Sequence, residues 1–505
     1  MIKNKSYSIL FLLSVITLFF YYGSYKEITQ HPRGIHVWRQ CDCAQFAWNY
    51  YTQSMNFFEP RLSHCEGNDG KMGSEFPIIY YAAAILYKIF GFHDYFIRFI
   101  NLLFFITGLL YLFKAIALFL EDTFYGFVLA LMVFTSPMVI DYANNFLPDV
   151  PALSVTFIAY YYFLNFEKTK ATNQLYKSIF FFAFAGLLKV TALMGFLAIV
   201  ATMLLGFIFR IATNKQEYWN TNKKQLLAFI TIPLIVSALW ILYIKQYNLA
   251  NHNKYFLTTI VPIWSLDDES IKQVWGSFQY IWLREFIYRD FTNCMPFVFL
   301  LCFFIPNRKN ISALLFLFLL IAAGILHVLL FFGQFLVHDY YLISLIPIPI
   351  AICTIFLLRL KGWKPAIVNS TGMKLAVLIL LLVMIYHGQR IYTIREKSES
   401  WSYYNDFYKM ENVVDSIGIK TTDKVMSIGD FSSGMSLYFI NRRGFTSMMF
   451  TPPKATKKDF EYCISKGAKY VLISDSGEEY ITEDAKKLYL KTEMINVDGV
   501  KFYKL

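Results

Sequence analysis

Residues 36–75 read HVWRQCDCAQFAWNYYTQSMNFFEPRLSHCEGNDGKMGSE, a polar and aromatic stretch between two apolar runs of membrane length. In its first half, apolar side chains recur at helical spacing at Ala44, Phe46, Ala47, Tyr50 and Tyr51. This spacing predicts an amphipathic helix that lies in the membrane interface. The alternative is an ordinary solvated loop with aromatic anchors. The rest of the chain favours a functional reading of this stretch.

The composition is that of a membrane protein. Of the 505 residues, 56% are hydrophobic and only 16% are charged. Apolar runs of about 18 to 22 residues, the length that crosses a bilayer, alternate with short polar breaks. The fold class predicted is therefore a polytopic α-helical membrane protein. The net charge of +12 is explained by Lys and Arg retained on one membrane face, because no aromatic-interleaved basic patch of the nucleic-acid-binding type is present.

Eleven spans are predicted, at about 9–22, 96–119, 124–141, 150–166, 177–190, 191–212, 226–247, 294–306, 311–332, 341–359 and 374–391. The segment 77–90 is apolar but short, and we expect a juxtamembrane helix there. Breaks assigned to the cytoplasm carry cations, for example Lys168, Lys170 and Lys177, whereas the breaks 142–149 and 333–340 carry no Lys or Arg. This asymmetry predicts a cytoplasmic N-terminus and a C-terminal tail on the outer side.

Two domains are predicted: a transmembrane domain at 1–394, with an outer loop at 24–95, and an extracytoplasmic α/β domain at 395–505. In the second domain a helical pattern at 407–417 precedes a strand at 424–428, and another at 457–466 precedes a strand at 470–474. Strands that alternate with helices predict a small layer with partly parallel strands. No GxGxxG or P-loop motif is present, so nucleotide binding has no support. We expect this domain to cover the outer loops and to help select an acceptor without supplying catalytic groups.

Three of the seven cysteines, Cys41, Cys43 and Cys65, fall near one another. With His36 and His64 they could form a metal cluster, although no CxxC spacing supports it. A disulfide from Cys65 to one of the other two is a second alternative if the loop faces an oxidising space. If neither alternative holds, all seven cysteines are expected to be unpaired thiols.

Polar residues at the ends of predicted spans are the other candidates for chemistry. Asp149 precedes Pro151 at the start of a span, where a helix cap is its plain structural role. His338 and Asp339 stand at another span entrance and could be interfacial polar residues. Lys189 lies between two apolar runs. Burial of a lysine charge there costs free energy unless the side chain reaches the interface or pairs with an anion.

Together these groups suit one kind of chemistry. The carboxylates of Asp42 and Asp149 face the outer side, and the cations Arg39, Arg61 and Lys189 could hold a phosphate at the membrane rim. A sugar donor on a lipid phosphate needs this arrangement, with its tail in the bilayer and its sugar outside. An acceptor hydroxyl then needs a carboxylate to take its proton as the anomeric bond forms.

The order of the motifs resembles that of the GT-C fold glycosyltransferases, in the branch of protein O-mannosyltransferases and lipid A aminoarabinose transferases. The motifs that carry the resemblance are Asp42, 56–62 (NFFEPRL), 73–77 (GSEFP), 90–91 (FG) followed by Arg98, Asp149, and 186–189 (GLLK). They cover roughly residues 1–390 and concentrate before residue 190. Each is short, and their order carries the specificity.

The resemblance implies an inverting transfer of a sugar from a polyprenyl-phosphate donor on the extracytoplasmic face. Asp42 matches the family's first-loop acidic residue, a base or metal-associated group, and Lys189 the lysine near the donor phosphate. Tyr340 and Tyr341 match a tyrosine near that phosphate. Where the family often has Asp-Glu, Cys43 follows Asp42, and 75–77 reads EFP where the family often has Lys-Pro-Pro. These departures leave the acceptor and a divalent metal open, and no other cofactor is predicted.

The predicted function is a membrane glycosyltransferase that serves a glycan, lipid or protein acceptor, placed in a bacterial inner membrane, with no nucleic-acid partner. The predicted site has Asp42 and Asp149 as catalytic groups; Lys189, Arg39, Arg61, Tyr340 and Tyr341 at the donor phosphate; and Trp38, Gln40, Glu75 and His338 at the substrate. A transporter or flippase of lipid-linked glycans is the main alternative. Transporters tend to place charged residues at the bilayer midplane and to consist of two repeated halves, whereas here the polar residues gather at one membrane face. A receptor or assembly scaffold is the third, and it leaves the polar first loop unexplained.

Overall fold

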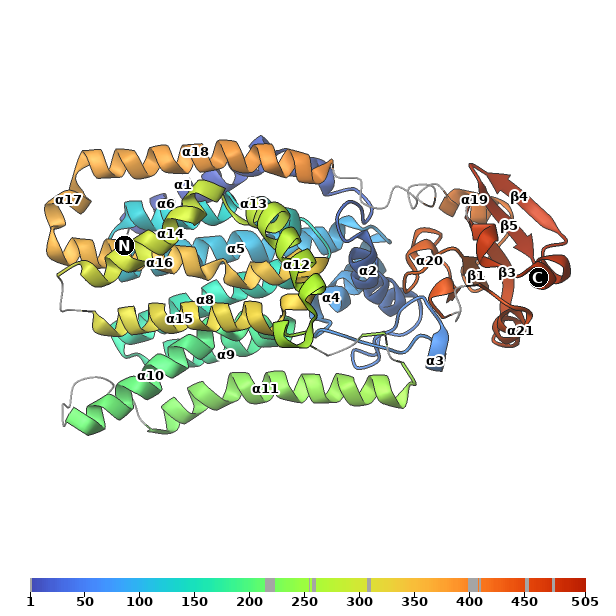
Figure 1. Cartoon of the computed structure of the whole chain (residues 1–505), viewed down its shortest axis with the longest axis horizontal. Coiled ribbons are helices and arrows are strands. Elements are labelled where there is room, and N and C mark those ends of the chain that lie inside the picture. Colours follow the sequence, from blue (N-terminus) through green and yellow to red (C-terminus); the bar gives the residue numbers. More distant parts are fainter. Residues whose placement is uncertain are drawn as a thin grey trace.

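The computed structural model describes residues 2–213, 223–253, 255–256, 260–306, 310–397, 407, 410–449, 454–474 and 477–505. A bundle of long helices runs along the longest axis, and a small sheet lies at one end of it (Figure 1). The first loop, with helices α2 (Val37–Thr52) and α4 (Ile78–Phe90), lies between the bundle and the sheet. The short helix expected at 77–90 is confirmed by α4.

The long helices of the bundle follow the predicted apolar runs. They are α1 (Ile2–Tyr22), α5 (Tyr95–Leu120), α6 (Thr123–Phe134), α8 (Asp149–Thr169), α9 (Thr172–Leu188), α10 (Met194–Thr213), α11 (Lys223–Ala250), α14 (Arg289–Phe304), α15 (Ile311–Leu330), α16 (Pro347–Trp363) and α18 (Thr371–Glu396). Short elements connect them, namely η1 (Ser24–Glu27), α3 (Glu66–Asp69), α7 (Pro137–Ala143), η2 (Val190–Leu193), η3 (Ile263–Ser265), α12 (Asp268–Ser277), η4 (Phe278–Trp282), α13 (Leu283–Phe286), η5 (Phe332–Leu336), η6 (Asp339–Leu345) and α17 (Pro365–Asn369).

Within the described residues, seven helices are long and apolar enough to cross a membrane, and up to nine spans result if each of two bent helix pairs is one span. The two remaining predicted spans are occupied by α8 and α9, which do not pass that test. Helix α8 is largely buried and packs against α5 and α9, so a uniformly apolar surface toward lipid is not required of it. The polytopic helical fold is confirmed, and the number of eleven spans stays a prediction.

One predicted span is bent in the structure, and a second follows directly after a bend. The run 124–141 was expected to be one helix, but α6 and α7 meet at 75°. Ser136 causes the break, because its Oγ accepts a hydrogen bond from Val139 N and Pro137 follows at the first helical position. The run 294–306 belongs to α14, which meets the segment Asp268–Phe286 at 94°.

The surroundings of α2 differ from the prediction. The helix forms where the spacing placed it, but nearly all of its residues from Gln40 to Tyr50 are buried, the polar ones included. It therefore does not lie in the interface with one face in solvent. Phe46 stacks on Tyr80 of α4, while Gln45 Oε1 accepts a hydrogen bond from Ser63 N, 2.8 Å away. Every face of α2 is covered because the C-terminal domain packs where solvent was expected.

The C-terminal part carries a five-stranded sheet in the order β2-β1-β3-β5-β4. Its strands are β1 (Lys424–Ile428), β2 (Arg443–Thr446), β3 (Ala468–Ile473), β4 (Glu493–Val497) and β5 (Val500–Lys504), and its helices are α19 (Met410–Ser416), α20 (Met435–Phe439), α21 (Lys457–Ser465) and α22 (Glu483–Tyr489). Strand β1 is parallel to β2 and β3, and β5 is antiparallel to β3 and β4. The expected α/β layer with partly parallel strands is confirmed; residues 408–409 of the expected 407–417 helix lie outside the described residues.

The sheet is attached to the first loop by backbone and charged contacts. Cys65 N donates to Gly444 O over 2.6 Å, and Gly444 N donates to Ser63 O over 3.0 Å. Asp69 accepts from Arg443 and Lys424, at 3.1 and 3.0 Å. The first loop therefore joins the edge of the sheet and places α20 against α2.

Candidate functional site

Asp42 lies in the second turn of α2 and is almost wholly buried, with 1% of its surface exposed. Tyr255 Oη donates a hydrogen bond to its Oδ2 over 2.9 Å, and the Ser433 hydroxyl donates to its Oδ1. Arg39 Nη1 stands 3.6 Å from Oδ2, one helical turn before Asp42. Both carboxylate oxygens thus have neutral hydroxyl donors, and one cation lies beside them.

Burial is the largest influence on the ionisation of Asp42. It raises the pKa of the carboxyl to about 6, against the opposing effect of Arg39 and the hydrogen bonds from Ser433 and Tyr255. A carboxyl with a pKa near neutrality can both exist as a base and take up a proton during a reaction.

A chain of alternating charges leads from Asp42 toward the bundle. Arg39 Nη2 lies 2.5 and 2.7 Å from the two oxygens of Glu75. Lys189 Nζ lies 3.5 Å from Glu75 Oε1 and 3.2 Å from Asp149 Oδ1. Although burial alone would raise it, Arg39 and Lys189 hold the pKa of Glu75 well below its usual range, so that Glu75 is ionised.

The local backbone explains why Glu75 and Lys189 meet. Trp240 Nε1 donates to Ser74 O over 3.2 Å, and Asn248 exchanges two hydrogen bonds of 2.9 Å with the backbone of Gly73, so α11 fixes the segment before Glu75. Lys189 ends α9 in an extended conformation. Three residues earlier, a Cβ on Gly186 would lie 2.2 Å from Ser237 Oγ, so glycine allows α9 to approach α11 closely.

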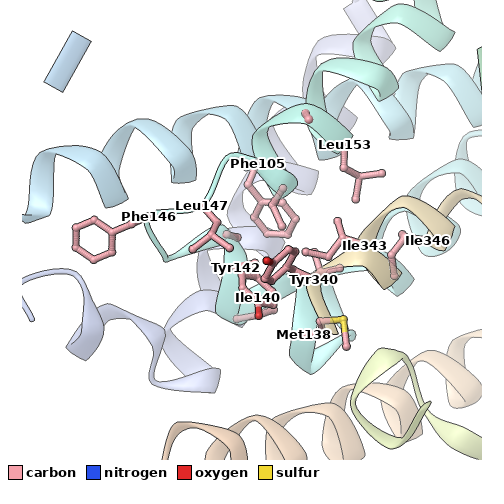
Figure 2. Close-up of a cluster of buried hydrophobic side chains, with 14 of the residues drawn as sticks. Phe105, Met138, Ile140, Tyr142, Phe146, Leu147, Leu153, Tyr340, Ile343 and Ile346 are labelled. Carbon is pink, nitrogen blue, oxygen red and sulfur yellow. The ribbon is translucent and has the colours of Figure 1, made fainter. Parts of the chain in front are cut away.

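Tyr340 and Tyr341 cover the lysine from the other side. Lys189 Nζ lies 5.1 Å from the ring centroid of Tyr340 and 5.4 Å from that of Tyr341, distances typical of cation–π contacts. Figure 2 shows Tyr340 beside Tyr142 in a cluster of buried side chains from α5, α7, α8 and η6. The position of the Tyr340 ring is therefore set by a packed core, and the Tyr341 ring stacks on it.

A second buried network supports η6 from behind. Asp339 Oδ1 accepts from His36 Nε2 at 2.9 Å and from Tyr142 Oη at 2.5 Å. Asp339 Oδ2 lies 2.7 Å from Arg395 Nη1, at the end of α18. Arg395 also pairs with Asp141, at 2.9 Å, and with Glu285. These contacts join the start of α2 to η6, where Tyr340 and Tyr341 stand.

The other predicted site residues are placed unevenly. His338 contacts the rings of Tyr340 and His36 and belongs to this region. Gln40 instead donates to the carbonyls of Arg33 and Ile35, so it holds the start of α2. Trp38 is one residue before Arg39 on the same helix, and its Nε1 is buried with no partner among the described residues.

Arg61 does not join the cluster. Its guanidinium lies 3.3 Å from Glu59 and 3.3 Å from Asp69, and its backbone pairs with Lys71 in the outer loop. Both partners of Arg61 lie in the outer loop and neither belongs to the charge chain, so the structure does not bring Arg61 to Lys189, and its role at the donor phosphate stays a prediction. The position of Arg61 in the first outer loop was not enough to predict which groups its guanidinium contacts.

Asp149 makes no side-chain cap on α8, contrary to its plain structural role. Its Oδ1 pairs with Lys189, and its Oδ2 is buried without a hydrogen-bond partner in the described part of the chain. Arg39 Nη1 and His338 Nδ1 are also buried without a hydrogen-bond partner there. Buried polar atoms are nearly always satisfied, and these three belong to the charge chain or to the neighbouring His338.

Two residues of the site were not predicted, Tyr255 after α11 and Ser433 in the C-terminal domain. Ser433 and Asp42 are 391 positions apart. Only the neighbouring turn pattern GDFSSGMS at 429–436 could have marked Ser433 as a special position. The C-terminal domain therefore contacts the central carboxylate through Ser433, while the expectation that it supplies no catalytic group stays a prediction.

The two alternatives to unpaired cysteines, a disulfide and a metal cluster, are not found among the residues that the structure describes. All seven cysteines are free, so Cys65 forms no disulfide. His36 and His64 are engaged elsewhere, with Asp339 and Thr446. Among the residues that the structure describes, no three His, Cys, Asp or Glu side chains are grouped to hold a metal ion. The carboxylates of the site are matched by Arg39 and Lys189 instead, which does not fit a metal centre.

Chemically, the site combines a buried carboxylate of raised pKa, two cations and two aromatic rings at the boundary between the bundle and the first loop. Cations next to rings can hold a phosphate with a sugar, and a carboxylate can take a proton from a nucleophile.

Comparison with known proteins agrees with this chemistry. Residues 74–243 match the family model described as Dolichyl-phosphate-mannose-protein mannosyltransferase. The match contains Glu75, Asp149 and Lys189, three of the five members of the charge chain. A search of curated protein sequences finds no match.

The fold is shared with solved structures. ArnT from Cupriavidus metallidurans in the apo state is 10% identical, with a TM-score of 0.59 over 99% of this chain and 98% of that chain. The same protein bound to undecaprenyl phosphate gives 11% identity and 0.60, over 98% and 97%. The Archaeoglobus fulgidus oligosaccharyltransferase tethered with an acceptor peptide gives 11% and 0.52, over 99% and 74%.

This chain is a membrane glycosyltransferase with the GT-C fold. The prediction of an enzyme is thereby confirmed over the transporter and scaffold alternatives. The predicted arrangement, a helical bundle followed by a small α/β layer, is confirmed.

Proposed function

We propose that this GT-C glycosyltransferase moves a sugar from a polyprenyl-phosphate donor to an acceptor on the extracytoplasmic side, with inversion at the anomeric carbon. The observation that carries the proposal is the continuous chain Asp42, Arg39, Glu75, Lys189 and Asp149. In this chain a buried carboxylate is linked through Arg39 and Glu75 to a lysine capped by two tyrosines.

In this proposal Lys189 and Arg39 hold the donor phosphate. Lys189 is a point charge that can exchange a carboxylate partner for a phosphate oxygen. The rings of Tyr340 and Tyr341 limit its movement and exclude water. The similarity to an ArnT structure bound to undecaprenyl phosphate and to an archaeal AglB structure in complex with dolichol-phosphate supports a lipid phosphate as the leaving group.

Asp42 is the proposed base. It takes the acceptor's proton as the new bond to the anomeric carbon forms and the bond to the donor phosphate breaks. Asp149 orients Lys189 and offers its free Oδ2 to the sugar. Trp38 and His338 are proposed substrate contacts. The domain boundary near residue 395, the bacterial inner membrane and the outward position of the C-terminal domain are parts of the same proposal.

The test is donor capture. Purified full-length protein is incubated with a native lipid extract, washed, and analysed by mass spectrometry for a bound polyprenyl-phosphate sugar. Lys189→Met should lower donor retention by about 10-fold or more, because a charged hydrogen bond contributes about 1.5–3 kcal/mol. Lys168→Met, which removes an exposed lysine paired with Glu121, is the matched control and should retain donor normally. Equal retention by the Lys189 variant would show that the lysine only balances its two carboxylates.

A further inference from the structure

The hydroxyl group that donates a hydrogen bond to Asp42 Oδ1 belongs to a side chain of the same protein. Ser433, from the C-terminal domain, donates its hydroxyl hydrogen bond to Asp42 Oδ1, and neither residue has more than 1% of its surface exposed. A hydroxyl that donates to the proposed base is in the arrangement that an acceptor hydroxyl needs before it loses its proton. Ser433 thus occupies a hydrogen-bonding position on that oxygen that an acceptor hydroxyl would take.

The turn at 429–436 is built to present this serine. Asp430 accepts hydrogen bonds from Ser432 N at 2.8 Å and from Ser436 N at 2.9 Å. Ser432 Oγ accepts from Met435 N at 2.7 Å, at the start of α20. Side chains on either side of Ser433 are thus engaged within the turn, while the Ser433 hydroxyl points out of it to Asp42.

Gly434 lets the turn lie directly on α2. Its φ is +118°, a conformation that other residues rarely adopt, and a Cβ there would lie 2.9 Å from Gln45 Oε1, so glycine suits both the turn and its close approach to the helix. Gln45 is one turn after Asp42 on α2. Close contact at Gly434 is therefore what brings the neighbouring Ser433 to the carboxylate.

The charges of the site restrict what can replace Ser433. Asp42, Glu75 and Asp149 are matched by two cations, Arg39 and Lys189, so with all groups ionised the cluster carries a net charge of −1. The donor phosphate adds negative charge. A phosphate acceptor next to Asp42 would add more in a buried place, where like charges repel strongly. A hydroxyl acceptor adds none.

We propose that the Ser433 hydroxyl holds the place of the acceptor hydroxyl on Asp42, and that the acceptor is a neutral hydroxyl compound which displaces Ser433 before transfer. This inference rests on the proposed function. In the transfer step the acceptor oxygen forms a bond to the anomeric carbon and its proton goes to Asp42. The bond from the anomeric carbon to the phosphate oxygen breaks, and the polyprenyl phosphate leaves with the electron pair.

The test compares Ser433→Ala with the wild-type protein, both full length and supplied with the native lipid extract. Glycerol is the probe acceptor and inorganic phosphate is the comparison. Loss of the internal competitor should increase formation of a glycerol glycoside by about 2- to 10-fold, the equilibrium worth of one neutral hydrogen bond. Neither protein should form a sugar phosphate. Ser427→Ala is the control, because Ser427 is equally buried in β1 and its hydroxyl contacts Ser436 rather than Asp42.

A second measurement does not depend on turnover. Labelling of Asp42 by a water-soluble carbodiimide at pH 6, followed by peptide mapping, should be faster in Ser433→Ala than in the wild-type and Ser427→Ala proteins. Unchanged labelling, or slower transfer to glycerol in Ser433→Ala, would overturn the inference, since Ser433 would then position Asp42 during the reaction. Sugar phosphate formation would overturn the acceptor class. If the proposed function itself fails, wild-type protein consumes no donor while the difference in labelling persists.

Discussion

Substitution of Asp42 by Asn tests the assignment of the base most directly. Asparagine keeps the size of the side chain, and its oxygen can still accept the hydrogen bond from Ser433. Its amide can donate to Tyr255 Oη in place of the contact now 2.9 Å long. Arg39 keeps its two short contacts with Glu75, so no buried cation loses its only partner. The structure therefore predicts a folded protein that still binds the donor.

What Asp42→Asn loses is the proton acceptor. Removal of a general base lowers a rate by about 10²–10⁴-fold. A loss of this size corresponds to an activation free energy that is higher by about 3–5 kcal/mol. Donor retention should stay within about twofold of wild type, because Lys189 and Tyr340 are unchanged.

The assay measures initial rates of donor consumption by mass spectrometry, together with a thermal melt and the donor-retention measurement. Asp484→Asn, at an exposed position of α22, is the control for the same chemical change. Wild-type turnover in a folded Asp42→Asn protein would refute the base assignment. Loss of donor retention together with turnover would instead move Asp42 into the donor site.

Three further predictions follow from the same contacts. Turnover should rise with pH through a half-maximum near pH 6, because Asp42 must be ionised to act and burial raises its pKa to about 6 with Arg39 and Glu75 as its charged neighbours; a flat profile between pH 5 and 7 would contradict this. Asp149→Asn should lower turnover by about 10-fold, less than Asp42→Asn, because Lys189 keeps Glu75, and a larger loss in initial-rate measurements would make Asp149 the base. A reporter fused after Leu505 should be active only as an extracytoplasmic type, and activity of a cytoplasmic reporter would overturn the predicted side of the membrane.

Local pattern predicted much of the fold. The helical spacing in the first loop placed α2, and the short apolar run placed α4, because periodicity and length depend on neighbouring residues only. The strands β1 and β3 were predicted for the same reason. The break between α6 and α7 was not predicted, although Ser136-Pro137 is a typical helix start. The continuous apolar run 124–141 has the length of one span, and the prediction followed that length.

Long-range contacts could not be predicted in the same way. Asp42, Asp149 and Lys189 were placed on one membrane face by counting spans, and the structure brings all three into one cluster through Glu75 and Arg39. Arg61 was assigned by the same reasoning and lies elsewhere. No local pattern ties Ser433 to Asp42, because their contact depends on the way the C-terminal sheet docks on the first loop.

The charge chain also explains how such a buried site can pass through the reaction without accumulating charge. During the proposed transfer, the acceptor's proton neutralises Asp42, and the leaving phosphate gains one negative charge. The negative charge therefore moves from Asp42, beside Arg39, to the phosphate, beside Lys189, and the sum over the cluster stays the same. Because Glu75 contacts both cations, it can shift between them as each loses or gains its anion. A site with one cation would have to bury an unpaired charge at one end of the reaction, at a cost of several kcal/mol.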